Sequence, residues 1–157
     1  MRAYLLVTGA GLAAALSGCG GAGPADPQPS LAGTVYVLKR VDGAELPQPV
    51  GADEAGAQYQ VTLGELSFTS ARDAVMAYTL QRAGDGGSTA VVRLLRYAAD
   101  GLRVVLTPAG PPGAVVESDT AVIADGTLRV RSRLSASLTA PGTDRDLEYV
   151  EEAPPAP

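Results

Sequence analysis

Four Asp-Gly dipeptides punctuate the sequence, at residues 42–43, 85–86, 100–101 and 125–126. Asp-Gly readily supplies the positive φ angles that tight β-hairpin turns need. The last two of these dipeptides stand directly between apolar runs, which is the local pattern of a hairpin. Glycine (19) and proline (12) are abundant among the 157 residues, and this composition favours turns over long helices. The sequence therefore predicts a succession of short antiparallel strands.

The alternation of side chains supports that interpretation. In TLRVRSRL (127–134), three apolar residues and Ser132 share one face, and three arginines occupy the other. A period of two residues is typical of a strand with one face in water. In YQVTLGELSFTS (59–70) the apolar parity changes at Gly64, where a β-bulge would reconcile the two halves. The other predicted strands are 33–41, 73–82, 88–98, 101–108, 114–124 and 146–152.

Eight strands joined by mostly short connections limit the possible folds. Only one connection is long, at about residues 42–58, and no helical pattern of ten or more residues occurs beyond the N-terminal segment. Eight consecutive antiparallel strands can close an up-and-down barrel, which removes the exposed edges of the sheet. A two-sheet β-sandwich is the alternative. We therefore expect an all-β domain over residues 31–150 and a disordered, proline-rich tail at 151–157.

The N-terminus has the features of an export signal. Arg2 is followed by an apolar segment at residues 3–16, which has the length of a signal-peptide core and is short for a membrane span. LSGC (16–19) then resembles a bacterial lipobox, with a leucine three positions before the only cysteine and small residues between them. The resemblance implies a lipoprotein signal peptide at 1–18, cleavage between Gly18 and Cys19, and a diacylglyceryl group on the Cys19 thiol. The alternatives are a free reactive thiol, a conventional signal peptide or a buried N-terminal helix.

Lipidation at Cys19 would make a membrane the first partner of this protein. Each buried methylene contributes about 0.8 kcal/mol, so two or three acyl chains anchor a protein without an amphipathic helix. The Gly/Pro-rich residues 19–30 would form a flexible tether that reaches about 20 Å. The predicted location is the cell envelope, after export across the inner membrane. Gly20, where an aspartate would signal inner-membrane retention, favours the outer membrane.

A further resemblance lies in LAGTVYVLKRVDGAELP (31–47), which is similar to the opening strand of small bacterial lipocalin-like lipoproteins. The resemblance implies a lipocalin-like barrel with the 42–58 connection over its mouth, but it does not carry over a lipocalin's ligand. We expect the interior either to hold a small apolar or amphipathic molecule or to be filled by the protein's own side chains. The same stretch also resembles the first strand of the META-type heat-shock lipoprotein domain. The lipocalin-like pattern is carried by Gly33, Thr34, Tyr36, Leu38, Val41, Gly43, Leu46 and Pro47.

Residues that face the inside of the predicted barrel are candidates for contact with a ligand. They are equally candidates for core packing, because side chains can just fill an eight-stranded barrel. An open cavity would favour ligand binding, whereas a contiguous exposed apolar patch would favour a structural or protein-interaction lipoprotein without a ligand. The candidates are Tyr36, Leu38, Met76, Tyr78, Leu80, Leu128, Val130 and Tyr149.

The residue types needed for catalysis are scarce. The chain has no histidine, Cys19 would be consumed by lipid, and Lys39, the only lysine, stands beside no motif. We therefore predict no enzymatic activity and no cofactor. The net charge of −5 becomes −6 when Arg2 is removed with the signal peptide, and an acidic protein gains no attraction to nucleic acid.

Two charged patterns remain. The acidic pairs Asp144/Asp146 and Glu117/Asp119 lack the glycine-containing, ligand-rich loop of a calcium site, so no metal is predicted. The arginine stripe of 127–134 faces away from its apolar residues. We expect these arginines to pair across the sheet with Glu148 or Glu117, rather than to bind an anionic partner or line a polar interior. The stripe consists of Arg129, Arg131 and Arg133.

Overall fold

The computed structural model describes residues 30–110, 118–134 and 142–153, and these residues form an all-β structure without a helix. The predicted fold class is confirmed, because eight of the strands close an antiparallel up-and-down barrel. The signal segment, Cys19, most of the tether and the end of the tail lie outside the described residues. The strands are β1 Val35–Val41, β2 Ala44–Glu45, β3 Gln48–Ala52, β4 Gln58–Phe68, β5 Asp73–Arg82, β6 Ser88–Asp100, β7 Arg103–Pro108, β8 Asp119–Ala124, β9 Thr127–Leu134 and β10 Thr143–Glu151.

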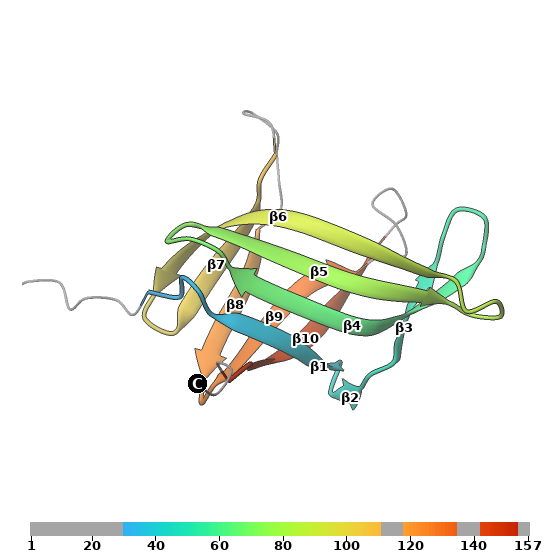
Figure 1. Cartoon of the computed structure of the whole chain (residues 1–157), viewed down its shortest axis with the longest axis horizontal. Helices are drawn as coiled ribbons and strands as arrows, with labels where there is room; N and C mark the ends of the chain where they lie inside the picture. The colour runs from blue at the N-terminus through green and yellow to red at the C-terminus, as the bar shows by residue number, and fades with distance from the viewer. Residues whose placement is uncertain (1–29, 111–117, 135–141, 154–157) are drawn as a thin grey trace, which may run out of the picture.

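Strand β1 closes the barrel, because it pairs with β10 on one side and with β4 on the other. From β4 to β10, each strand pairs with the next strand along the chain. In Figure 1, β1, β4, β5 and β6 cross the front of the molecule, and β7 to β10 lie behind them at a steep angle. A sandwich of two separate sheets is therefore excluded in favour of one continuous sheet that returns on itself.

The structure corrects two details of the predicted strands. The long 42–58 connection contains β2, which pairs with β1, and β3, which pairs with β4. The bulge in β4 lies between Val61 and Leu63, not at Gly64. Leu63 therefore points outward and is 62% exposed, although the sequence pattern had placed it on the inner face. The reason is that a bulge reverses the side-chain parity at once, so every residue after Val61 changes face.

Gly64 has a packing role instead of a bulge role. A Cβ atom at this position would lie 2.8 Å from Cβ of Leu38 and 3.3 Å from a ring carbon of Tyr78. Only a residue without a side chain allows β1 and β5 side chains to approach the β4 backbone this closely. Gly64 lies opposite Tyr78 in the β4–β5 register. The side chains of Leu38 and Tyr78 occupy the interior space that a side chain at this position would take.

The barrel interior is a hydrophobic core built from all eight barrel strands. At one end, the Phe68 ring packs edge-on against Tyr36, with ring centroids 5.9 Å apart, and against Tyr97 at 4.8 Å. Edge-to-face contacts of this kind stabilise aromatic pairs beyond the burial of their area. Leu66, Met76, Leu106 and Ala121 continue the core from β4, β5, β7 and β8, each with essentially no exposed surface.

The two ends of the barrel differ in their connections. The N-terminal residue of β1 and the chain just beyond β10 meet at one end, where the Glu152 amide donates to the Val35 carbonyl at 2.8 Å. The short turns at 101–102 and 125–126 close that same end. The long connection with β2 and β3 lies at the opposite end. A tether that precedes β1 therefore enters at the end with short turns.

Candidate functional site

All eight predicted interior residues lie together inside the barrel. Each has between 0 and 4% of its surface exposed, and they belong to β1, β5, β9 and β10. Leu38 lies opposite Tyr149 in the β1–β10 register, and Leu128 is opposite Tyr149 in the β9–β10 register. The strands thus bring these side chains together as the sequence predicted, and their near-complete burial makes them packing residues of the core.

A polar cluster, consisting of Arg93, Asp119 and Ser132, lies at the inner face among these apolar residues. The Arg93 guanidinium donates to the Ser132 hydroxyl at 2.9 Å and forms an ion pair with Asp119 at 3.3 Å. The Ser132 hydroxyl donates to the same Asp119 carboxylate at 2.6 Å. The Arg93 and Asp119 side chains are only 21% and 12% exposed. Each side chain of the cluster therefore has a hydrogen-bond or ion-pair partner within it, as charged groups of low exposure require.

Two buried tyrosine hydroxyls adjoin the polar cluster. The Tyr78 hydroxyl donates to the Met76 sulfur, and burial raises the pKa of Tyr78 to about 12. Burial also raises the pKa of Tyr149 well above its ordinary value, and the Tyr78 hydroxyl adds to that shift. Within the described residues, no group completes a well-formed hydrogen bond with the Tyr149 hydroxyl. The Tyr78 hydroxyl is therefore a polar contact of the Tyr149 hydroxyl, at a geometry short of a full hydrogen bond.

Sequence reasoning missed Arg93 and Asp119 as interior residues. Strand β6 is apolar at outward positions as well, since Val92 and Leu94 alternate with inward Val91 and Leu95. With apolar residues on both faces, the phase of the strand could not be fixed from its pattern. One signal in the sequence pointed to a polar position in the interior. Ser132 lies on the otherwise apolar face of its strand, and a hydroxyl buried there needs polar partners.

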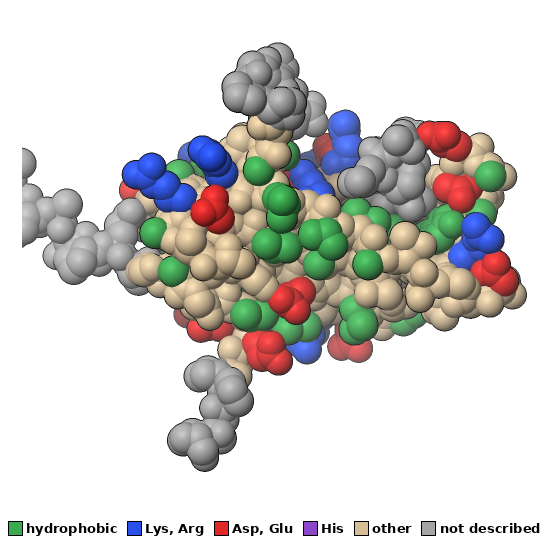
Figure 2. All heavy atoms as spheres, turned by 45° about the horizontal axis from the view of Figure 1, so that its top comes forward, with side chains coloured by type: hydrophobic (Ala, Val, Ile, Leu, Met, Phe, Trp, Pro, Cys, Tyr) green, Lys and Arg blue, Asp and Glu red, His purple; other side chains and the backbone are tan. Residues whose placement is uncertain are grey.

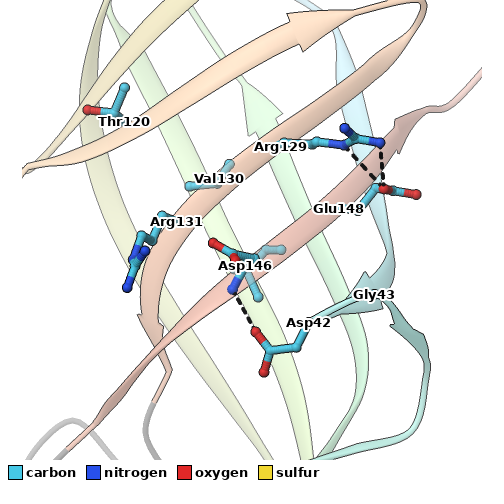
Figure 3. A pocket seen from close by; sticks show the side chains of 9 residues that line it. Asp42, Gly43, Thr120, Arg129, Val130, Arg131, Asp146 and Glu148 are labelled. Atoms are coloured by element: carbon cyan, nitrogen blue, oxygen red, sulfur yellow. Dashed lines mark hydrogen bonds and ion pairs between the residues drawn. The ribbon is translucent and has the colours of Figure 1, made fainter.

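The arginine stripe of β9 faces outward, as expected. Arg129 forms an ion pair with Glu148 at 3.2 Å, which confirms the expected partner, whereas Arg133 pairs across the sheet with Asp144 at 3.5 Å and not with either expected glutamate. Arg129 and Glu148 border an open groove of about 510 Å³ on the outer face of β9 and β10, whose lining includes Thr120, Arg131 and Asp146 (Figure 3). Because charges of both signs alternate along it, the groove favours no ligand of a single charge.

Asp42 forms one wall of that groove and clamps the end of β1 to β10. Its carboxylate accepts from the Asp146 amide at 2.9 Å and from Arg145 at 2.6 Å, and its own amide donates to the Asp146 carbonyl at 2.7 Å. Asp42 also has a φ of 51°, which the Asp-Gly turn predicted. The hydrogen bond from the Asp146 amide, followed by the Arg145 side chain, lowers the pKa of Asp42.

A second feature of the outer surface is an apolar face on β4, β5 and β6, consisting of Leu63, Val75, Ala77, Val92 and Leu94. Val75 lies opposite Leu94, and Ala77 lies opposite Val92, in the β5–β6 register. Leu94 is 62% exposed and Val92 is 51% exposed. Figure 2, in which the top of Figure 1 comes forward, shows hydrophobic side chains gathered along this side of the barrel. Exposed apolar side chains that adjoin in this way mark a contact surface.

The described residues offer little for catalysis or metal binding. Lys39 is exposed on β1. Within the described ranges, no three acidic, histidine or cysteine side chains come together as metal ligands. Asp144 is engaged by Arg133, and Glu117 lies outside those ranges. The same ranges contain no helix that could cross a membrane.

Comparison with known proteins gives no family assignment. No protein-family model matches this sequence, and no curated protein matches it either. The function therefore has to be argued from the residues and their geometry.

The polar cluster predicts a large difference between two arginines that both form ion pairs. Arg93→Met leaves Asp119 charged at low exposure, and we expect a loss of about 3 kcal/mol in the free energy of unfolding. Arg129→Met removes a pair whose arginine is 75% exposed, and we expect a loss under about 1 kcal/mol. Urea denaturation of both variants measures the difference. Equal losses would contradict the structural importance of the cluster, and adding Asp119→Leu to Arg93→Met should recover most of the stability.

The Asp42 clamp predicts a dependence of stability on pH. Because its pKa is lowered in the folded state, the ionised carboxylate stabilises the fold above about pH 4, and this contribution is lost as the pH falls through the lower folded value. Asp42→Asn should cost about 1 kcal/mol at pH 7, because the side chain is partly exposed, and less than that at pH 3. Urea denaturation at both pH values checks this.

Asp125→Asn is the matched control for that measurement. Asp125 has the same φ of 51° in an Asp-Gly turn, but the described structure gives its side chain no hydrogen bond or ion pair. We expect little loss of stability at either pH. A comparable loss in both variants would assign the effect to turn conformation and not to the clamp.

Proposed function

We propose that this protein is a lipid-anchored protein of the cell envelope, held at a membrane through Cys19. The apolar segment at 3–16 and the lipobox-like LSGC support export followed by lipidation. The barrel geometry is compatible with that attachment, because the chain enters β1 at the end of the barrel with short turns. The anchored barrel would then present its opposite end and its sides away from the membrane.

The barrel itself, in this proposal, is a protein-interaction module without catalytic activity. The observation that carries this choice is the contrast between the two sides of its sheet. The predicted ligand-contact residues have between 0 and 4% of their surface exposed, so they are occupied in packing against one another. Leu63, Val92 and Leu94, by contrast, are more than half exposed on one outer face. Apolar surface that remains in water is where a partner gains the most on binding.

A second candidate function is the binding of a small amphipathic molecule, with its polar group at the polar cluster. The observation that favours it is the buried Tyr149 hydroxyl, which lies near the Tyr78 hydroxyl but completes no well-formed hydrogen bond within the described residues. An open groove of about 470 Å³ also has Asp119 and Ser132 in its wall, so the cluster adjoins solvent. Such a ligand would complete the hydrogen bonding of Tyr149, but it would have to displace side chains that now fill the interior.

The anchor is tested by metabolic labelling with radioactive palmitate. Cys19→Ala should lose the label entirely, because the thiol is the atom that receives the lipid. Ser17→Ala is the control, since it keeps a small residue before the cleavage site and should be labelled like the wild type. Labelling that persists in Cys19→Ala would exclude a lipid anchor at this residue.

Native mass spectrometry of the full mature protein, released from detergent micelles, tests the role of the interior. If the barrel is an interaction module, the mass should equal that of one or two lipidated chains with no small molecule bound. A stoichiometric small molecule would contradict this role. Loss of that molecule in Tyr149→Phe would then place it at the polar cluster and establish the second candidate.

A further inference from the structure

The barrel is not closed along its full length, because β6 is longer than the strand beside it. β7 pairs only with the second half of β6, from Leu95 opposite Pro108 to Asp100 opposite Arg103. Of the described strands, only β5 pairs with the first half, residues 88–94. In Figure 1, the β5–β6 hairpin extends well past the end of β7. Among the described residues, this half of β6 is therefore an open sheet edge.

The backbone direction identifies the groups at this edge. The Leu94 carbonyl accepts from the Ala109 amide at 2.8 Å, so the backbone groups of Leu94 point away from β5. In an antiparallel sheet, alternate residues direct their N–H and C=O groups to the same side. The N–H and C=O groups of Val92 and Ala90 therefore also point away from β5. Within the described residues, neither has a hydrogen-bond partner on that side.

The sequence of this edge lacks the usual protection against pairing. STAVV (88–92) has no charge, no proline and no glycine, and the β5–β6 register runs without a bulge. Arg93, the next residue, is directed inward to Asp119. The edge at the other side of the extended hairpins is different, since β3 carries Pro49 and a bulge between Pro49 and Gly51. Proline and bulges are common devices against edge-to-edge pairing, and β6 has neither.

We propose that the 88–94 edge of β6 is the interface with a second copy of this protein. Two β6 edges can pair antiparallel about a two-fold axis centred near Val91, which places Ala90 of each copy opposite Val92 of the other. Within the described residues, the outward backbone groups of both have no partner, so each pair can exchange two hydrogen bonds. This inference deepens the proposed function, because it names the partner. It rests on that function in one respect, namely that the barrel binds partners through its outer surface.

Self-association fits this edge better than pairing with a charged partner. The one charged side chain of residues 88–94, Arg93, is directed inward to Asp119, so identical copies bring no like charges together at this edge. The pairing also joins the apolar faces of the two copies, since Val92 and Leu94 belong to both the edge and that face. The contact is isologous, because the same β6 edge is used by both copies, and it therefore closes at two copies. The edge at β3 is protected against pairing by Pro49 and its bulge, so the dimer does not extend into a fibre.

Two valines of equal exposure provide a matched test. Val92 is 51% exposed at the proposed interface, and Val122 is 50% exposed on the outer face of β8. Val92→Lys places an ammonium group beside its counterpart and should weaken the dimer roughly tenfold or more. Val122→Lys should leave the dimerisation constant unchanged. Analytical ultracentrifugation of the full mature protein in detergent measures both, and circular dichroism verifies that both variants fold.

A cross-linking experiment in native membranes gives an independent readout. Diagonal neighbours across paired strands lie about 7–8 Å apart, which a short bis-maleimide spans. Val92→Cys should yield a covalent dimer, whereas Val122→Cys should not. A wild type that is monomeric at every concentration, or equal cross-linking of both variants, would overturn the proposal, and cross-linking to other proteins alone would do the same.

The test separates this inference from the proposed function. Palmitate labelling of the same Val92 and Val122 variants reports the anchor without regard to dimerisation. A labelled protein that never pairs through β6 would refute the dimer and leave the anchored module intact. A β6-paired dimer that holds a stoichiometric small molecule would retain the interface and refute the ligand-free role.

Discussion

The pairing of β1 with both β4 and β10 is the interaction on which the rest of this structure depends. Because β1 pairs on both sides, the meander becomes a closed sheet. In a closed sheet, successive residues of each strand face the barrel interior and the exterior in turn. The Asp42 clamp lies at the end of β1 and fixes its end to β10 through one amide and one guanidinium. In the closed barrel, the core is built from the side chains of the eight strands themselves.

Closure also explains why charge is distributed as it is. Two outward arginines of β9, Arg129 and Arg133, pair with acids on β10 at exposed positions, where such pairs contribute little. The inward ion pair of Arg93 and Asp119 has lost most of its hydration, so it requires Ser132 as a further partner. The two kinds of pair look alike in the sequence but differ in environment. The inner pair joins β6 to β8, which are separated by β7, whereas the outer pairs join the adjacent strands β9 and β10.

The barrel, its strand order and its apolar interior could be predicted from the sequence, because period-two alternation and Asp-Gly turns are local signals. The parity of β4 could not, since the bulge after Val61 depends on how β4 and β5 pair and leaves no residue signature of its own. The inner position of Arg93 was hidden for a related reason. Its strand carries apolar residues on both faces. The partners that hold Arg93 inside, Asp119 and Ser132, come from β8 and β9, which do not pair with β6.

The apolar outward positions that obscured the phase of β6 are themselves informative. A strand with one face in water has no structural need for Val92 and Leu94 on that face, and exposure of both works against solubility. Both exposed side chains lie on the half of β6 that does not pair with β7. An exposed apolar face and an unprotected backbone edge thus coincide on one short segment. A partner strand would satisfy both at once, so the unequal lengths of β6 and β7 fit an interface better than a defect of closure.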